Sequence, residues 1–124
     1  MSARNEILVV EDSPTQAEKL RYLLEERGYE VAVAGNGREG LIAAGERRPA
    51  LVVSDIVMPE MDGPTLLKAM REKNPDIKFI FVSGYAEDAF EKSLPEGQQF
   101  DFLPKPFTLS QLVAAVKETM TKQG

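Results

Sequence analysis

Short apolar runs recur five times along the chain, separated by polar stretches that contain glycine or proline. They are residues 7–10, 31–34, 51–53, 79–82 and 100–103, and most are rich in β-branched or aromatic side chains. A near-continuous apolar run of this length is typical of a strand that is buried on both faces. The pattern therefore predicts five short buried strands.

Five stretches with helical spacing lie between and after these runs. Ser13 with Pro14 marks the start of the first helix, and Asp62 marks that of the third. Thr108 and Gln111 stand in capping-box positions before the last helix. The apolar faces of the first and last helices are Ala17, Leu20 and Leu24, and Leu109, Leu112, Val113, Val116 and Met120.

The alternation of strands and helices predicts an α/β fold. Such a chain forms a parallel sheet with helices on both faces and right-handed crossovers. We expect a doubly wound, flavodoxin-like sheet of five strands in the order 2-1-3-4-5, formed by a single domain of residues 1–124 with its core at about 6–121. Ligands of open sheets bind beyond the carboxyl ends of the strands, so the residues that follow each strand are candidates for chemistry.

Composition narrows the chemistry further. The 124 residues carry a net charge of −5, which does not favour a nucleic-acid or anionic membrane surface. No apolar run reaches the roughly 18 residues of a membrane span, so we expect a cytoplasmic protein without membrane insertion.

Cysteine and histidine are both absent, which excludes disulfides, thiolate catalysis, ordinary zinc sites and phosphohistidine on this chain. A bound metal would therefore be a hard cation held by oxygen.

Acidic residues follow two strands that the predicted order makes neighbours. Glu11 and Asp12 come after the first strand, and Asp55 comes after the third. Carboxylates crowded at one edge repel one another unless a cation neutralises them, and oxygen ligands with room for water and phosphate suit Mg²⁺. We therefore predict Mg²⁺ at this edge, with Mn²⁺ tolerated.

Ser83 and Lys105 follow the fourth and fifth strands. With a cation in place, one oxygen of Asp55 could bind the metal while the other attacks phosphorus to form an acyl phosphate. The Lys105 ammonium and the Ser83 hydroxyl would then bind oxygens of the transferred group. These residues together predict a phosphoryl acceptor.

The segments ILVVED, SDIVMPEMDG, FVSG and FLPKPF, in this order and at these separations, resemble the receiver domain of two-component response regulators. The resemblance covers essentially the whole chain. It implies that Asp55 is the phosphoacceptor and that Glu11, Asp12 and the backbone carbonyl of Val57 complete the Mg²⁺ site. It further implies that Ser83 and Phe102 form the conformational switch, with Phe in place of the more usual Tyr.

The same resemblance implies a cis peptide bond between Lys105 and Pro106. It also implies partners: a sensor histidine kinase or a histidine phosphotransfer domain as donor, and a downstream target on the face of the fourth helix, fifth strand and fifth helix. Direct nucleic-acid binding is not expected. GYAEDAF and FLPKPF resemble receivers of hybrid histidine kinases, so the chain is expected to be either a stand-alone regulator or a receiver of a larger protein.

Each site residue also has a purely structural interpretation. Glu11 and Asp12 could simply favour the N-terminus of the first helix, and Ser83 could be a turn residue. Lys105 taken alone suggests solvated surface, and Phe102 suggests core. The placement of these residues at successive strand ends favours the functional interpretation.

Two other functions fit the same fold. A Mg²⁺-dependent phosphatase with an Asp nucleophile needs an acid–base carboxylate two residues later, where Val57 stands. A flavodoxin-like FMN carrier needs a first loop that binds phosphate, whereas Glu11 and Asp12 would repel it. We therefore expect a signalling switch that catalyses only its own phosphorylation and slow dephosphorylation, not a turnover enzyme.

Overall fold

The computed structural model describes residues 6–56, 58, 61–83 and 100–121. Its elements in chain order are β1 (Glu6–Val10), α1 (Pro14–Glu25), β2 (Glu30–Ala34), α2 (Gly37–Arg47), β3 (Leu51–Asp55), α3 (Gly63–Lys73), β4 (Lys78–Ser83), β5 (Asp101–Pro104) and α4 (Leu109–Thr121). The helix predicted between the fourth and fifth strands lies outside the described residues, so α4 corresponds to the last predicted helix.

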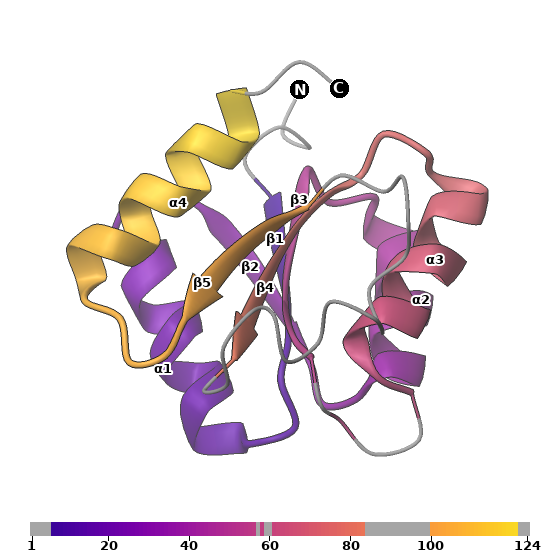
Figure 1. The fold of residues 1–124 in the computed structure, drawn as a ribbon, viewed down its shortest axis with the longest axis horizontal. Coiled ribbons are helices and arrows are strands. Elements are labelled where there is room, and N and C mark those ends of the chain that lie inside the picture. Colours follow the sequence, from indigo (N-terminus) through magenta and orange to yellow (C-terminus); the bar gives the residue numbers. More distant parts are fainter. Residues whose placement is uncertain (1–5, 57, 59–60, 84–99, 122–124) are drawn as a thin grey trace.

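The strands form one parallel sheet in the order β2-β1-β3-β4-β5, which confirms the predicted topology. Figure 1 shows α1 and α4 on one face of this sheet and α2 and α3 on the other. The winding reverses between β1 and β3, because the chain moves outward to β2 before it returns to β3. The carboxyl ends of β1 and β3 therefore lie side by side at the point where such folds bind ligands.

Alternate residues of each central strand enter different cores. Ile7 and Val9 of β1 pack with Leu20 and Leu24 of α1. The intervening residues of β1 pack with α2 and α3 on the opposite face. The described central strands β1, β3 and β4 are buried along nearly their whole length, as the apolar runs predict.

The prediction of full burial is wrong for the two outer strands. In β2, Glu30 and Val33 are exposed and only Ala34 is buried. In β5, Asp101 and Phe102 are half-buried and Leu103 is buried. Both strands lie at the edges of the sheet, where a partner strand is present on one side only and the covering helices reach less of the surface.

The predicted helix caps are present. Ser13 and Asp62 each accept a hydrogen bond from the backbone N–H three residues later, at 3.4 and 2.9 Å. Thr108 and Gln111 form the reciprocal capping box, with distances of 3.1 Å to the threonine hydroxyl and 2.8 Å to the glutamine side chain. Asp62 is thus a capping residue, which leaves the acidic site to other carboxylates. Within the described residues, no helix is both long enough and apolar enough to cross a membrane.

Candidate functional site

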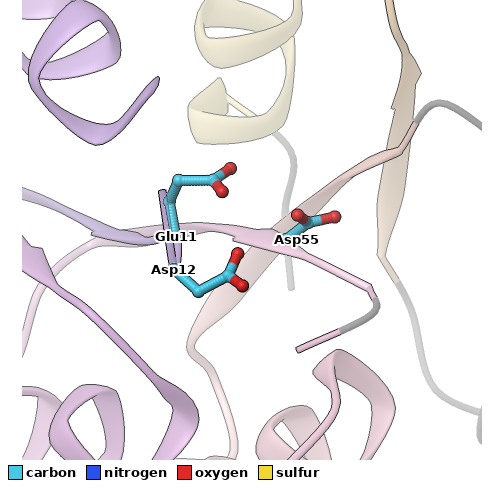
Figure 2. Close-up of side chains that lie close together, drawn as sticks. All are labelled: Glu11, Asp12 and Asp55. Atoms are coloured by element: carbon cyan, nitrogen blue, oxygen red, sulfur yellow. The ribbon is translucent and has the colours of Figure 1, made fainter. Parts of the chain in front are cut away.

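Three carboxylates meet at the carboxyl ends of β1 and β3. In the register of the sheet Val10 pairs with Ser54, so the residues that follow these two lie at the same edge. Glu11, Asp12 and Asp55 each place one carboxylate oxygen within 4.8 Å of the others. Figure 2 shows the three side chains gathered at this edge, two from the segment after β1 and one from the end of β3. The predicted acidic cluster therefore forms.

Glu11 is the buried member of the cluster, with 3% of its surface exposed. Its Oε2 accepts a hydrogen bond from the Ser13 N–H at 3.2 Å, while its Oε1 is buried without a hydrogen-bond partner. Burial raises the pKa of Glu11, and the nearby charge of Asp55 adds to this effect. The Ser13 N–H and the Lys105 ammonium act in the opposite direction but do not cancel it. An additional cation at this position would therefore stabilise the charged form of Glu11.

The donor set fits a small divalent cation. Among the described residues the candidate ligands are carboxylate oxygens, and the Glu11 Oε1 is a buried acceptor without a hydrogen-bond partner. Asp12 is exposed, which leaves one side of the cluster open to water and to an incoming group. Hard cations such as Mg²⁺ bind in this way, with a few carboxylates and the remaining positions open. The predicted carbonyl ligand, at Val57, lies outside the described residues.

The two oxygens of the Asp55 carboxylate have different surroundings. Oδ1 accepts a hydrogen bond from the backbone N–H of Ile56 at 2.9 Å. Oδ2 lies 3.9 Å from the Nζ of Lys105. The side chain keeps 17% of its surface exposed, so it is shielded but accessible. The carboxylate is therefore oriented by its own backbone and faces a positive charge.

Lys105 is directed into the site by its main chain. Its backbone N–H donates to the carbonyl of Ser83 at 2.7 Å, and the following peptide bond to Pro106 is cis, as predicted. Its Nζ lies 3.6 Å from Glu11 Oε1 and 3.9 Å from Asp55 Oδ2. Lys105 is not solvated surface, because only 30% of its side chain is exposed and its ammonium bridges two acids.

Ser83 ends β4 and is buried, with 2% exposure. It pairs with Pro104 in the sheet, immediately before the lysine, so β3, β4 and β5 bring Asp55, Ser83 and Lys105 to one edge. An acidic cluster, a hydroxyl and a lysine at the carboxyl edge of a 2-1-3-4-5 sheet form the arrangement that the sequence predicted.

Comparison with known families agrees with this arrangement. Residues 7–117 match the response regulator receiver domain. The chain belongs to the response regulator receiver family. It is thus a signalling domain of two-component systems, which in this family act as phosphorylation switches.

Individual relatives of this receiver domain come from several kinds of protein. It is 51% identical to the sensor kinase CckA of Brucella abortus over 99% of its own length but only 13% of that protein. It is 36% identical to the transcriptional regulatory protein PrrA of Mycobacterium tuberculosis, over 95% of its own length and 51% of PrrA. The chain therefore spans a small part of the first relative and about half of the second.

Solved structures show the same fold. The receiver domain of the hybrid histidine kinase CckA is 37% identical and superposes with a TM-score of 0.79, covering 94% of this chain and 99% of that one. The chemotaxis protein CheY4 of Vibrio cholerae is 26% identical with a TM-score of 0.82, covering 92% and 97% of the two chains. The predicted resemblance to hybrid kinase receivers is thus confirmed as a similarity.

Phe102 of the receiver domain is half-buried on β5 and packs against the core shared by α2 and α3. This packing is that of a core residue at the edge of the sheet, and the part of Phe102 in a switch stays a prediction.

Sequence reasoning missed two features beside the phosphoacceptor candidate. One is the Ile56 N–H that binds Asp55 Oδ1. The other is Ser54, a fully buried hydroxyl between the apolar residues of β3 and Asp55. The available signal for Ser54 was a polar residue directly after the apolar run at 51–53. No sequence pattern indicates the Ile56 contact, because it involves the backbone.

Proposed function

We propose that this receiver domain accepts a phosphoryl group on Asp55 from a phosphohistidine donor, in a reaction that depends on Mg²⁺. The observation that supports this most directly is the joint position of three carboxylates and one lysine. The Lys105 Nζ lies 3.6 and 3.9 Å from Glu11 and Asp55, yet the buried Glu11 Oε1 still lacks a hydrogen-bond partner. One ammonium does not neutralise three acids.

Glu11, Asp12 and Asp55 would hold the metal, together with the carbonyl predicted at Val57. When bound, Mg²⁺ supplies positive charge that offsets the carboxylates and the oxygens of the transferring group. Mn²⁺ prefers the same hard oxygen ligands and is expected to substitute.

The remaining chemistry belongs to the side chains. An Asp55 carboxylate oxygen forms a bond to phosphorus while the bond between phosphorus and the donor nitrogen breaks, and the electron pair of that bond remains on the imidazole. The Ile56 N–H holds one Asp55 oxygen in place during the approach. The Lys105 ammonium stabilises charge on the phosphoryl oxygens, and Ser83 is proposed to donate its hydroxyl to one of them.

The donor histidine must come from outside this chain, which contains none. We propose a sensor histidine kinase or a histidine phosphotransfer domain as that partner, in keeping with the sensor and hybrid kinases among the relatives. Output is proposed on the surface of β5 and α4 together with the helix predicted before β5, with Ser83 and Phe102 as the switch. The protein is expected to act in the cytoplasm, without direct nucleic-acid binding.

The alternative function, a phosphatase that turns over a substrate, receives no support from the site. Such an enzyme needs an acid–base carboxylate two residues after its nucleophile, and the sequence has Val57 there. The carboxylates that do lie near Asp55 are Glu11 and Asp12, from the segment after β1. We propose that the chain catalyses only its own phosphorylation and slow dephosphorylation.

Intact mass spectrometry tests this proposal. After incubation with acetyl phosphate and Mg²⁺, the wild-type protein should gain the mass of one phosphoryl group, and Asp55→Asn should gain none. Chelation of the metal should abolish the gain in the wild type. An unmodified wild type, or equal labelling of Asp55→Asn, would contradict the assignment.

A further inference from the structure

Ser54 directly precedes the phosphoacceptor candidate and is fully buried, with 0% exposure. It lies in β3, where it pairs with Val10 of β1 and Phe81 of β4. Its hydroxyl donates to the backbone carbonyl of Asp55 at 2.8 Å. A buried hydroxyl needs a hydrogen-bond partner, and here that partner belongs to the peptide group between Asp55 and Ile56, at the end of β3.

The Asp55 carbonyl and the Ile56 N–H are two ends of the same peptide group. Because a peptide group is planar and rigid, a tilt at one end moves the other. Ser54 holds the carbonyl end at 2.8 Å, and the N–H end donates to Asp55 Oδ1 at 2.9 Å. The hydroxyl of Ser54 is therefore connected to the Asp55 carboxylate through one rigid plane.

Gly63 fixes the same backbone from the other side. Its N–H donates to the Ile56 carbonyl at 2.7 Å, which holds the next peptide group. A Cβ on Gly63 would lie 2.6 Å from the Asp55 carbonyl oxygen and 2.7 Å from the ring of Phe81. Only glycine can approach so closely, so the start of α3 packs directly against the peptide that Ser54 binds.

We propose that Ser54 is a positioning residue for the phosphoryl acceptor. It acts through the peptide group between Asp55 and Ile56, whose N–H keeps Oδ1 in place while Oδ2 faces Lys105. This role rests on the proposed function of Asp55. The glycine at position 63 is what leaves room for the arrangement.

The alternative is that Ser54 only satisfies its own hydroxyl and contributes to stability alone. The variant Ser54→Ala distinguishes a positioning role from a role in stability alone, and Val52→Ala is the matched control. Val52 is equally buried, lies on the same strand and faces the same core, but it has no hydrogen bond to the Asp55 peptide among the contacts of the described residues. Both variants should remain folded, and the folded fraction is checked by circular dichroism.

Two measurements are made on these variants at saturating Mg²⁺ and acetyl phosphate. Ser54→Ala should slow phosphorylation roughly three- to tenfold relative to wild type, as expected when one hydrogen bond that orients a reacting group is lost. It should also shift the Ile56 amide proton resonance of the metal-free protein upfield, toward a weaker hydrogen bond. Val52→Ala should change neither. Gly63→Ala should shift the same resonance, because its new Cβ displaces the Asp55 carbonyl.

The proposal requires both effects. It is overturned if Ser54→Ala is phosphorylated as fast as Val52→Ala, or if the rate falls without any change at the Ile56 amide. A wild-type protein that accepts no phosphoryl group would refute the function of Asp55 instead. In that case the amide resonance still decides whether Ser54 orients the carboxylate.

Discussion

At the scale of single residues, the site contains a buried carboxylate, Glu11, whose negative charge the described side chains do not fully offset. Glu11 is buried, and burial is the main reason that its pKa is raised above the ordinary 4.5, with the Asp55 charge adding to it. A carboxyl whose pKa is higher in the folded than in the unfolded chain stabilises the fold fully only below its unfolded pKa. That contribution is lost as the pH rises through the folded pKa. The metal-free protein is therefore destabilised by Glu11 near neutral pH.

Glu11→Gln should consequently raise the melting temperature of the metal-free protein at neutral pH. The gain should shrink as the pH falls through the raised pKa of Glu11 toward 4.5, because Glu11 of the folded wild type then becomes protonated as well. Thermal unfolding followed by circular dichroism in a chelator, across this pH range, measures the difference. Glu72→Gln is the control, since Glu72 is exposed on α3. A gain that is equal at both ends of the pH range would contradict the explanation.

The sequence predicts which side chains gather at the site but not how they are oriented. Strand ends and strand order are enough to place the site residues, which are Glu11, Asp12, Asp55, Ser83 and Lys105. The contacts that orient Asp55 could not be, because a hydrogen bond to a peptide group depends on the path of the loop.

At the scale of elements, the sequence predicted the helix caps correctly but overestimated the burial of the outer strands. The capping residues of three helices form the predicted hydrogen bonds, because a cap involves only residues within one turn. The outer strands β2 and β5 are less buried than their apolar runs suggest. Burial depends on the neighbours in the sheet, and an apolar run alone does not distinguish a central strand from an edge strand.

Thr108→Ala tests how much the capping box contributes to α4. The change removes the acceptor of the Gln111 N–H at the start of a helix that covers β4 and β5. It should lower the free energy of unfolding by about 1 kcal/mol, the usual cost of losing a threonine cap. Urea denaturation measures this loss, and Ser110→Ala, at an exposed position in the first turn, should leave stability nearly unchanged. A loss as large for Ser110→Ala, where alanine is the better helix former, would mean that the effect of Thr108→Ala does not come from the cap.

At the scale of the whole molecule, the acidic site lies at the carboxyl ends of two central strands, β1 and β3. β1 and β3 are neighbours in the middle of the sheet, and their side chains enter both cores. A cation that joins the residues at their ends therefore binds only when the sheet is assembled. Binding to the folded state alone shifts the folding equilibrium toward that state.

Mg²⁺ should accordingly stabilise the entire domain in one cooperative transition. At a free concentration one hundred times the dissociation constant, the free energy of unfolding should increase by about 2.7 kcal/mol. Denaturation curves recorded with increasing Mg²⁺ would show the midpoint moving continuously with concentration. Asp12→Asn removes one charge from the cluster at an exposed position and should weaken this dependence without unfolding the protein. The contradicting result is a denaturation midpoint that does not change with Mg²⁺ concentration although calorimetry detects binding. The ion would then bind the unfolded chain equally well, so the carboxylates at the ends of β1 and β3 would not act as one site.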